Sequence, residues 1–265
     1  VYWCTLNRSD GRDNFGDLLG KYIVEKISKR NIIWVLHPSM RRYKLFIKHY
    51  LTVGSILEVA NKNSVVWGSG IMRRFDFIKK ANFLAVRGPI TRRRLLEQGY
   101  KVPELYGDPA ILLPLFFKSK KPLKKYKIGI IPHYVDYEEV CQRFKNDRKV
   151  KIIDLLTYNV EEVLNEILEC KIIVSSSLHG VIVPHAYGIP ALWVKFSNKL
   201  GGDNIKFYDY FESVKIHYDK EFIVRSSELN IEHLINLFYK NKSRTIPSQE
   251  QVLERQKDLL KSNPF

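Results

Sequence analysis

The chain has 265 residues, of which 45% are apolar, so it can bury the core of one large or two ordinary domains and is not expected to be disordered. Its formal net charge of +16 favours an anionic partner: nucleic acid, an anionic membrane face or a phosphorylated molecule. No apolar run approaches the roughly 20 residues that span a bilayer, and no secretory signal is visible.

The cysteines and the acidic residues indicate neither a disulfide framework nor a metal site. Cys4, Cys141 and Cys170 are far apart and form no paired motif, which suits a reducing compartment, so we predict a cytoplasmic protein. Neither a zinc signature nor an Asp-rich calcium loop is present, and no metal is therefore expected.

Positive charge gathers at Arg41-Arg42, at residues 92–94 and at residues 118–127. A solvated surface explains any single cluster of this kind. No aromatic RNA-binding signature or zinc finger accompanies the clusters. We therefore predict no nucleic-acid partner and rank phosphorylated or membrane-bound substrates higher.

Strands and helices alternate along the first half of the chain. An amphipathic helix is expected from Asp17, and a second helix from Pro89 to near Gly99, where glycine suits a C-terminal cap. Strands are predicted over residues 1–6, 32–36, 64–67, 83–86 and 102–105.

Two turns in this half carry residues suited to ligand binding. Asn14, Gly16 and Asp17 lie where a predicted strand passes into the first helix. Gly16 permits close approach of a ligand to the backbone, and Asp17 either caps the helix or contacts the ligand. Arg87 follows a strand directly, and it could bind a phosphate or carboxylate through two N–H groups or form a surface ion pair.

A lysine-rich stretch at residues 118–125 separates two series of strands and helices. We interpret it as a solvated linker and predict an N-terminal domain over residues 1–118 and a C-terminal domain over residues 119–265. In the second domain, strands are predicted over residues 127–131, 150–153, 172–174 and 190–194, and helices over residues 138–144, 160–168, 206–211, 229–239 and 249–260.

A serine-rich turn at residues 175–180 lies between a predicted strand and a short helix. In parallel α/β sheets, ligands bind beyond the carboxyl ends of the strands, and the free N–H groups of the following helix favour an anion. Ser176, Ser177 and His179 are therefore candidates to bind an anionic group, and His133 holds a similar position after an earlier strand. The alternative is that the serines cap the helix and that His179 is structural.

The candidate residues thus gather at strand ends in both halves of the chain. Such an arrangement is typical of an α/β protein with two Rossmann-like domains facing a shared cleft. We predict this fold, with the ligand bound in the cleft.

Several motifs resemble those of the polysaccharide pyruvyltransferase family, and they keep the family's order over most of the chain. Each motif is weak alone, but their joint order is fairly specific. They are the turn Asn14 to Asp17, the glycine turn Val66 to Gly70, the strand end Val86 to Pro89, the loop Gly107 to Ala110, and the segment Ser175 to Gly180 followed by Gly188 to Pro190.

The resemblance implies a GT-B-like fold and the transfer of pyruvate from phosphoenolpyruvate to a sugar as a cyclic ketal, without a cofactor. It makes His179 the catalytic histidine and Arg87 a ligand of the donor's anionic groups. The family often carries an arginine two positions before the histidine, where this chain has Ser177. The donor site would then depend on Arg87 and a nearby cation such as Lys195.

The acceptor that the resemblance implies is a sugar of a surface polysaccharide or of its lipid-linked precursor, and the basic surface would hold the protein at an anionic membrane face. Two other functions stay open. A GT-B glycosyltransferase would use a nucleotide-sugar, although no feature of the sequence indicates a pocket for base and ribose. A non-catalytic glycan-binding module would explain the charge but not the positions of His179 and Arg87 at opposed strand ends.

Overall fold

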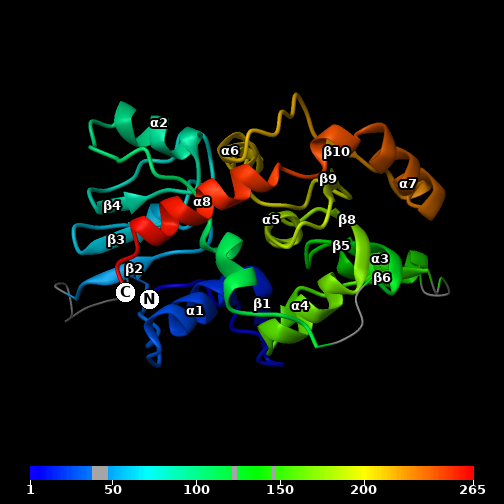
Figure 1. The fold of residues 1–265 in the computed structure, drawn as a ribbon, viewed down its shortest axis with the longest axis horizontal. Helices are drawn as coiled ribbons and strands as arrows, with labels where there is room; N and C mark the ends of the chain where they lie inside the picture. The colour runs from blue at the N-terminus through cyan, green and yellow to red at the C-terminus, as the bar shows by residue number, and fades with distance from the viewer. Residues whose placement is uncertain (38–46, 121–123, 145–146, 148) are drawn as a thin grey trace.

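The computed structural model describes residues 1–37, 47–120, 124–144, 147 and 149–265, and it is an α/β structure built on two parallel sheets (Figure 1). The strand order is β2-β3-β4 in the first sheet and β10-β9-β8-β5-β6 in the second. The predicted α/β class is therefore confirmed. The cluster Arg41-Arg42 and residues 121–123 of the predicted linker lie outside the described residues.

The first sheet has three strands of three or four residues each. The helices beside it begin at positions that suit a helix start. The Asn14 side chain accepts a hydrogen bond from the Gly16 N–H at the start of α1, and α2 begins with Pro89, whose missing N–H costs nothing there. The elements of this half are β1 (Asp13–Asn14), α1 (Phe15–Ser28), β2 (His49–Leu51), η2 (Leu57–Val59), β3 (Ser64–Trp67), β4 (Asn82–Ala85), α2 (Pro89–Glu97) and the 3₁₀ helix η3 (Pro109–Leu115).

The second sheet has five strands, and its three central strands are largely buried, as expected of parallel strands covered by helices. The elements of this half are β5 (Tyr126–Ile131), α3 (Tyr137–Phe144), β6 (Val150–Ile152), β7 (Leu156–Thr157), α4 (Val160–Leu168), β8 (Cys170–Ser175), α5 (His179–Ala186), β9 (Ala191–Lys195), α6 (Ile205–Ser213), β10 (Phe222–Ile223), η4 (Ser226–Glu228), α7 (Ile231–Lys240), η5 (Lys242–Arg244) and α8 (Gln249–Lys261). Within the described ranges, no helix combines the length and the apolar content needed to cross a membrane.

Three predicted strands do not form in the described part of the chain. Residues 1–6 make one bridge, between Tyr2 and Leu51, and residues 32–36 form no ladder. Residues 102–105 form no strand, and a single bridge pairs the next residue, Tyr106, with Val86. Pro103 provides a reason for the last failure, because proline has no N–H to donate to a neighbouring strand.

The C-terminal helix returns to the first sheet. The Trp67 indole N–H donates to the Leu259 carbonyl on α8 over 3.0 Å, and the Phe265 ring lies 5.6 Å from the Trp67 ring. Figure 1 shows α8 running along the first sheet, with the two termini close together. The domain limits at residue 118 stay a prediction, although α8 belongs by sequence to the second half and packs on the first.

A buried ion pair also joins the halves. Arg87 follows β4, Asp209 lies on α6, and both side chains are completely buried, with Arg87 Nε 2.9 Å from Asp209 Oδ2. Asp209 also accepts hydrogen bonds from the Thr91 N–H (2.8 Å) and the Thr91 hydroxyl (2.7 Å) at the start of α2. These hydrogen bonds join α6 of the second half to the N-terminal turn of α2.

We expect Asp209→Ala to lower the free energy of unfolding by about 3–5 kcal/mol, because it leaves the Arg87 guanidinium buried without its anion. Glu212→Ala is the matched control, since Glu212 joins the same two helices through Arg93, but with half-exposed side chains. It should cost at most about 1 kcal/mol. Urea denaturation measures both changes, and equal losses would contradict this account.

Candidate functional site

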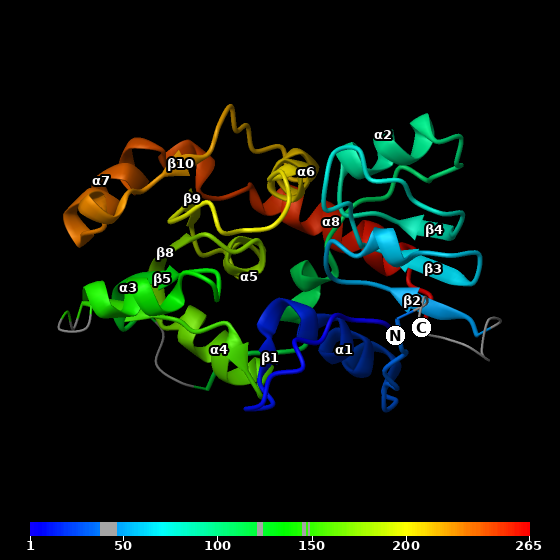
Figure 2. The ribbon, with the colours of Figure 1, turned by 180° about the vertical axis from the view of Figure 1, so that it is seen from behind.

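Three helix starts converge on His179. The histidine opens α5 after β8, Gly16 and Asp17 open α1, and Asp108 caps η3, which packs against both α1 and α5. Figure 2 shows α5 and α6 in the middle of the molecule, between the two sheets. The turns that the sequence singled out separately therefore meet at one place.

The His179 ring is held on two sides. Its Nε2 lies 3.5 Å from Oδ2 of Asp108, and neither of these buried atoms makes a hydrogen bond within the described residues. On the other side the ring lies against the backbone of Gly16, where an added Cβ would overlap Nδ1. The second carboxylate oxygen of Asp108 accepts from the Ala110 N–H (3.0 Å). A carboxylate fixed in this way can orient the imidazole for proton transfer.

Asp17 and Lys206 form a charged cluster with this histidine, in which Asp17 interacts electrostatically with both other groups. Burial raises the pKa of Asp17 to about 6; Asp13 adds to the rise, while the positive charges of His179 and Lys206 oppose it. Burial lowers the pKa of Lys206 to about 8, aided by the charge of Arg87 and opposed by Asp17. These mutual effects place the groups within electrostatic reach of one another.

His133 completes the cluster as a neutral side chain. Burial, with a contribution from the charge of Lys206, lowers the pKa of His133 to about 4. Its backbone N–H donates to the Ser176 hydroxyl over 2.8 Å. At neutral pH, His133 can therefore donate or accept a hydrogen bond but carries no positive charge.

Sequence reasoning missed Lys206, which lies on α6. Its ammonium is 5.6 Å from the centre of the Phe207 ring and makes no hydrogen bond or ion pair with any residue that the structure describes. One feature of the sequence could have drawn attention to this lysine: Lys206 stands between the apolar residues Ile205 and Phe207, on a helix with many buried residues. In the structure both neighbours are buried, and Lys206 itself is partly buried.

Arg87 reaches the cluster but faces protein atoms. Its guanidinium donates to Asp209 (2.9 Å), to the Ser55 hydroxyl (2.6 Å) and to the Ile71 carbonyl (2.8 Å), and none of its surface is exposed. The sequence predicted a ligand or a surface ion pair; the ion pair exists, but it is buried. A ligand role for Arg87 stays a prediction.

The remaining predicted residues have local partners. Ser177 is buried, and its N–H donates to the Ser175 hydroxyl (3.0 Å), so these serines shape the turn before α5. Lys195, at the end of β9, lies 3.6 Å from Glu221. The structure therefore brings Gly16, Asp17, His133 and His179 together but pairs Lys195 elsewhere.

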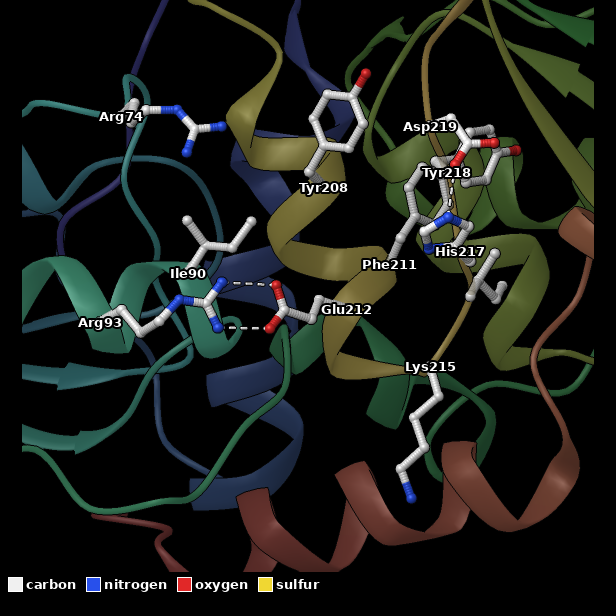
Figure 3. Close-up of a pocket in the computed structure, with 11 residues that line it drawn as sticks. Arg74, Ile90, Arg93, Tyr208, Phe211, Glu212, Lys215, His217, Tyr218 and Asp219 are labelled. Atoms are coloured by element: carbon white, nitrogen blue, oxygen red, sulfur yellow. Dashed lines mark hydrogen bonds and ion pairs between the residues drawn. The ribbon is translucent and has the colours of Figure 1, made fainter.

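A surface groove of about 800 Å³ lies between α2, α6 and residues 215–219, away from this cluster. Figure 3 shows the ion pair of Arg93 and Glu212 spanning it, with N···O distances of 2.6 and 2.8 Å. His217 and Asp219 are also paired, at 2.6 Å. Because much of the charge in this groove is already paired, we place the candidate chemistry at the buried cluster.

Comparison with known proteins identifies a family for this chain. A family model described as polysaccharide pyruvyl transferase matches residues 7–198. The chain is also 37% identical over 213 residues to an uncharacterised protein of Acanthamoeba polyphaga mimivirus, which covers 78% of this chain and 73% of that protein. No solved structure matches the chain.

We expect Gly16→Ala to displace the His179 ring, because the new methyl group would occupy the position of Nδ1. Overpacking of this kind should cost about 1–3 kcal/mol of stability. The histidine resonances in NMR spectra report the displacement, and thermal denaturation reports the cost. Gly201→Ala is the control, since no atom lies within 4 Å of its added Cβ. An unmoved His179 resonance would contradict the proposed contact.

The raised pKa of Asp17 gives a pH-dependent stability. Because its pKa of about 6 exceeds the ordinary 3.8, the folded chain binds this proton more tightly than the unfolded chain. The resulting loss of stability develops as the pH rises from about 4 to about 6 and is complete above that. Asp17→Asn should therefore stabilise the protein by about 3 kcal/mol at pH 7.5 and by much less at pH 4. Urea denaturation at both pH values tests this, and equal effects would refute it.

Proposed function

Because the chain belongs to the polysaccharide pyruvyl transferase family, we propose that it transfers pyruvate from phosphoenolpyruvate to a sugar as a cyclic ketal. The acceptor is a surface polysaccharide or its lipid-linked precursor, and no cofactor takes part. The observation that carries the proposal is the imidazole of His179, which lies beside the buried Asp108 carboxylate and near the charged side chains of Asp17 and Lys206.

The reaction needs a proton donor and charge stabilisation. A proton added to the methylene carbon of phosphoenolpyruvate leaves a cationic centre at the carbon that carries the phosphate. One sugar hydroxyl adds there and loses its proton; a second hydroxyl displaces phosphate and closes the ketal. A histidine can donate and accept these protons near neutral pH.

We assign the proton transfers to His179. The Asp108 carboxylate lies 3.5 Å from Nε2 of the ring, and Gly16 leaves room for the ring beside the start of α1. The partial positive charge at helix N-termini favours the anionic donor and the departing phosphate. Arg87, Lys195 and Lys206 are the candidate cations for the donor, and of these only Lys206 is without a carboxylate partner at salt-bridge distance.

The setting of the enzyme is part of the same proposal. A GT-B-like arrangement, with the two parallel sheets on either side of α5 and α6, would place donor and acceptor between the halves. The net charge of +16 supports a position at the anionic cytoplasmic face of a membrane, where a lipid-linked acceptor would be found.

We expect His179→Ala to lower the rate of phosphate release from phosphoenolpyruvate by at least ~100-fold, the usual scale for a positioned acid–base group. The assay uses a lipid-linked oligosaccharide as acceptor, and mass spectrometry identifies the pyruvylated product. His217→Ala is the control, because His217 is an exposed histidine of the surface groove.

Two results would count against the proposal. A folded His179→Ala variant with a normal rate would remove this histidine from the mechanism. Turnover of a nucleotide-sugar, with none of phosphoenolpyruvate, would make the protein a glycosyltransferase.

A further inference from the structure

A loop of the first half exposes two phenylalanine side chains. The loop joins β3 to β4, and it carries Phe75 and Phe77, which are 79% and 73% exposed and are the most exposed phenylalanines of the described chain. A single exposed apolar side chain needs no explanation, whereas two large aromatic ones on one short loop form a local apolar surface. This surface is a candidate contact with an apolar partner.

The backbone of the loop is held in place although its phenyl rings are not. Oδ2 of Asp76 accepts hydrogen bonds from the N–H groups of Met72 and Arg73, both over 2.9 Å. Arg94 on α2 donates to the carbonyls of Phe75 (3.1 Å) and Asp76 (3.0 Å). The two rings are therefore exposed on a loop that is bonded to itself and to a helix, and their exposure belongs to the folded structure.

Positive charge lies on both sides of the rings. The carboxylates bonded to the loop are those of Asp76 and Asp203, and both accept hydrogen bonds from its backbone. Apolar rings between unpaired cations match an anionic bilayer, because the rings can enter the acyl boundary while the cations lie among the headgroups. Four exposed basic side chains flank the rings without an ion pair in the described part of the chain: Arg73, Arg74, Lys79 and Lys80.

A protein partner fits this loop less well than a membrane does. Stable protein interfaces bury about 800 Å² on each side, whereas one phenylalanine side chain offers about 150–250 Å². A second copy of this chain would also bring its own four cations against these four, and like charges oppose such a contact.

We propose that residues 73–80 form a membrane-docking loop, in which Phe75 and Phe77 enter the surface of an anionic bilayer and the flanking cations contact its headgroups. The loop leaves the first sheet at the carboxyl end of β3, the edge at which parallel sheets bind ligands. Arg74 also lines the surface groove of Figure 3, so the loop lies beside that groove. The inference rests on the proposed function for a lipid-linked acceptor, but not for the membrane contact itself.

Flotation of the whole protein with vesicles of phosphatidylcholine and phosphatidylserine tests the loop, with vesicles of phosphatidylcholine alone for comparison. Phe75→Ser combined with Phe77→Ser should weaken binding to the anionic vesicles at least ~10-fold, because burial of one phenyl ring alone contributes about that much. Both side chains are exposed, so the variant should keep the wild-type melting temperature. Ile223→Ser combined with Tyr239→Ser is the matched control, since these side chains are 60% and 55% exposed in the second half.

The cations provide a second reading. Lys79→Gln combined with Lys80→Gln should weaken binding to the anionic vesicles by about 5-fold for each cation removed, and high salt should shrink this difference. Lys118→Gln combined with Lys120→Gln is the control, because it removes the same charge from exposed positions elsewhere.

The outcomes separate the loop from the proposed chemistry. Loop-dependent vesicle binding by a protein that does not turn over phosphoenolpyruvate keeps the loop and overturns the proposed function. Normal vesicle binding by the phenylalanine variant, or an equal loss in its control, overturns the loop while turnover of phosphoenolpyruvate keeps the function. Sedimentation velocity detects a contact between copies: a wild-type dimer that dissociates in the phenylalanine variant overturns the membrane assignment. Wild-type protein that floats with neither kind of vesicle overturns it as well.

Discussion

The buried ion pair between Arg87 and Asp209 is a central contact between the two halves of the molecule, which are also joined by the antiparallel pairing of β1 with β7. Removing two ions from water costs several kcal/mol each, and only good geometry with further hydrogen bonds offsets that cost. Here Asp209 accepts from three donors, two of them on Thr91, and Arg87 also donates to Ser55 and Ile71. The pair is thus specific to one docking of α6 against α2.

Close contacts with side chains explain why glycines occupy two of the motif positions. At Gly70 an added Cβ would collide with the guanidinium of Arg87, and at Gly16 it would collide with the ring of His179. Neither glycine has a positive φ, so neither is required by its own turn. Each is required by a side chain from a distant part of the chain. The motifs therefore occur together because their residues contact one another.

Only part of this fold and of this site could be predicted from the sequence alone. The apolar runs predicted the strands at 64–67 and 172–174 and the helices around them, because burial on both faces leaves a clear local pattern. The pairing of Arg87 depends on a residue more than 100 positions away, and the partial burial of Lys206 depends on how helices pack, so no local pattern encodes either. Residues 1–6 alternate like a strand, yet the structure gives them only one bridge.

The cluster is electrostatically costly for the folded chain, and this argues for function over structure. Asp17 is held with a raised pKa and Lys206 with a lowered one, so burial disfavours the charged form of both. A purely structural interior would be more stable with apolar or neutral side chains at these positions. Groups whose pKa values are shifted by burial beside an oriented histidine are typical of sites that bind and move charge.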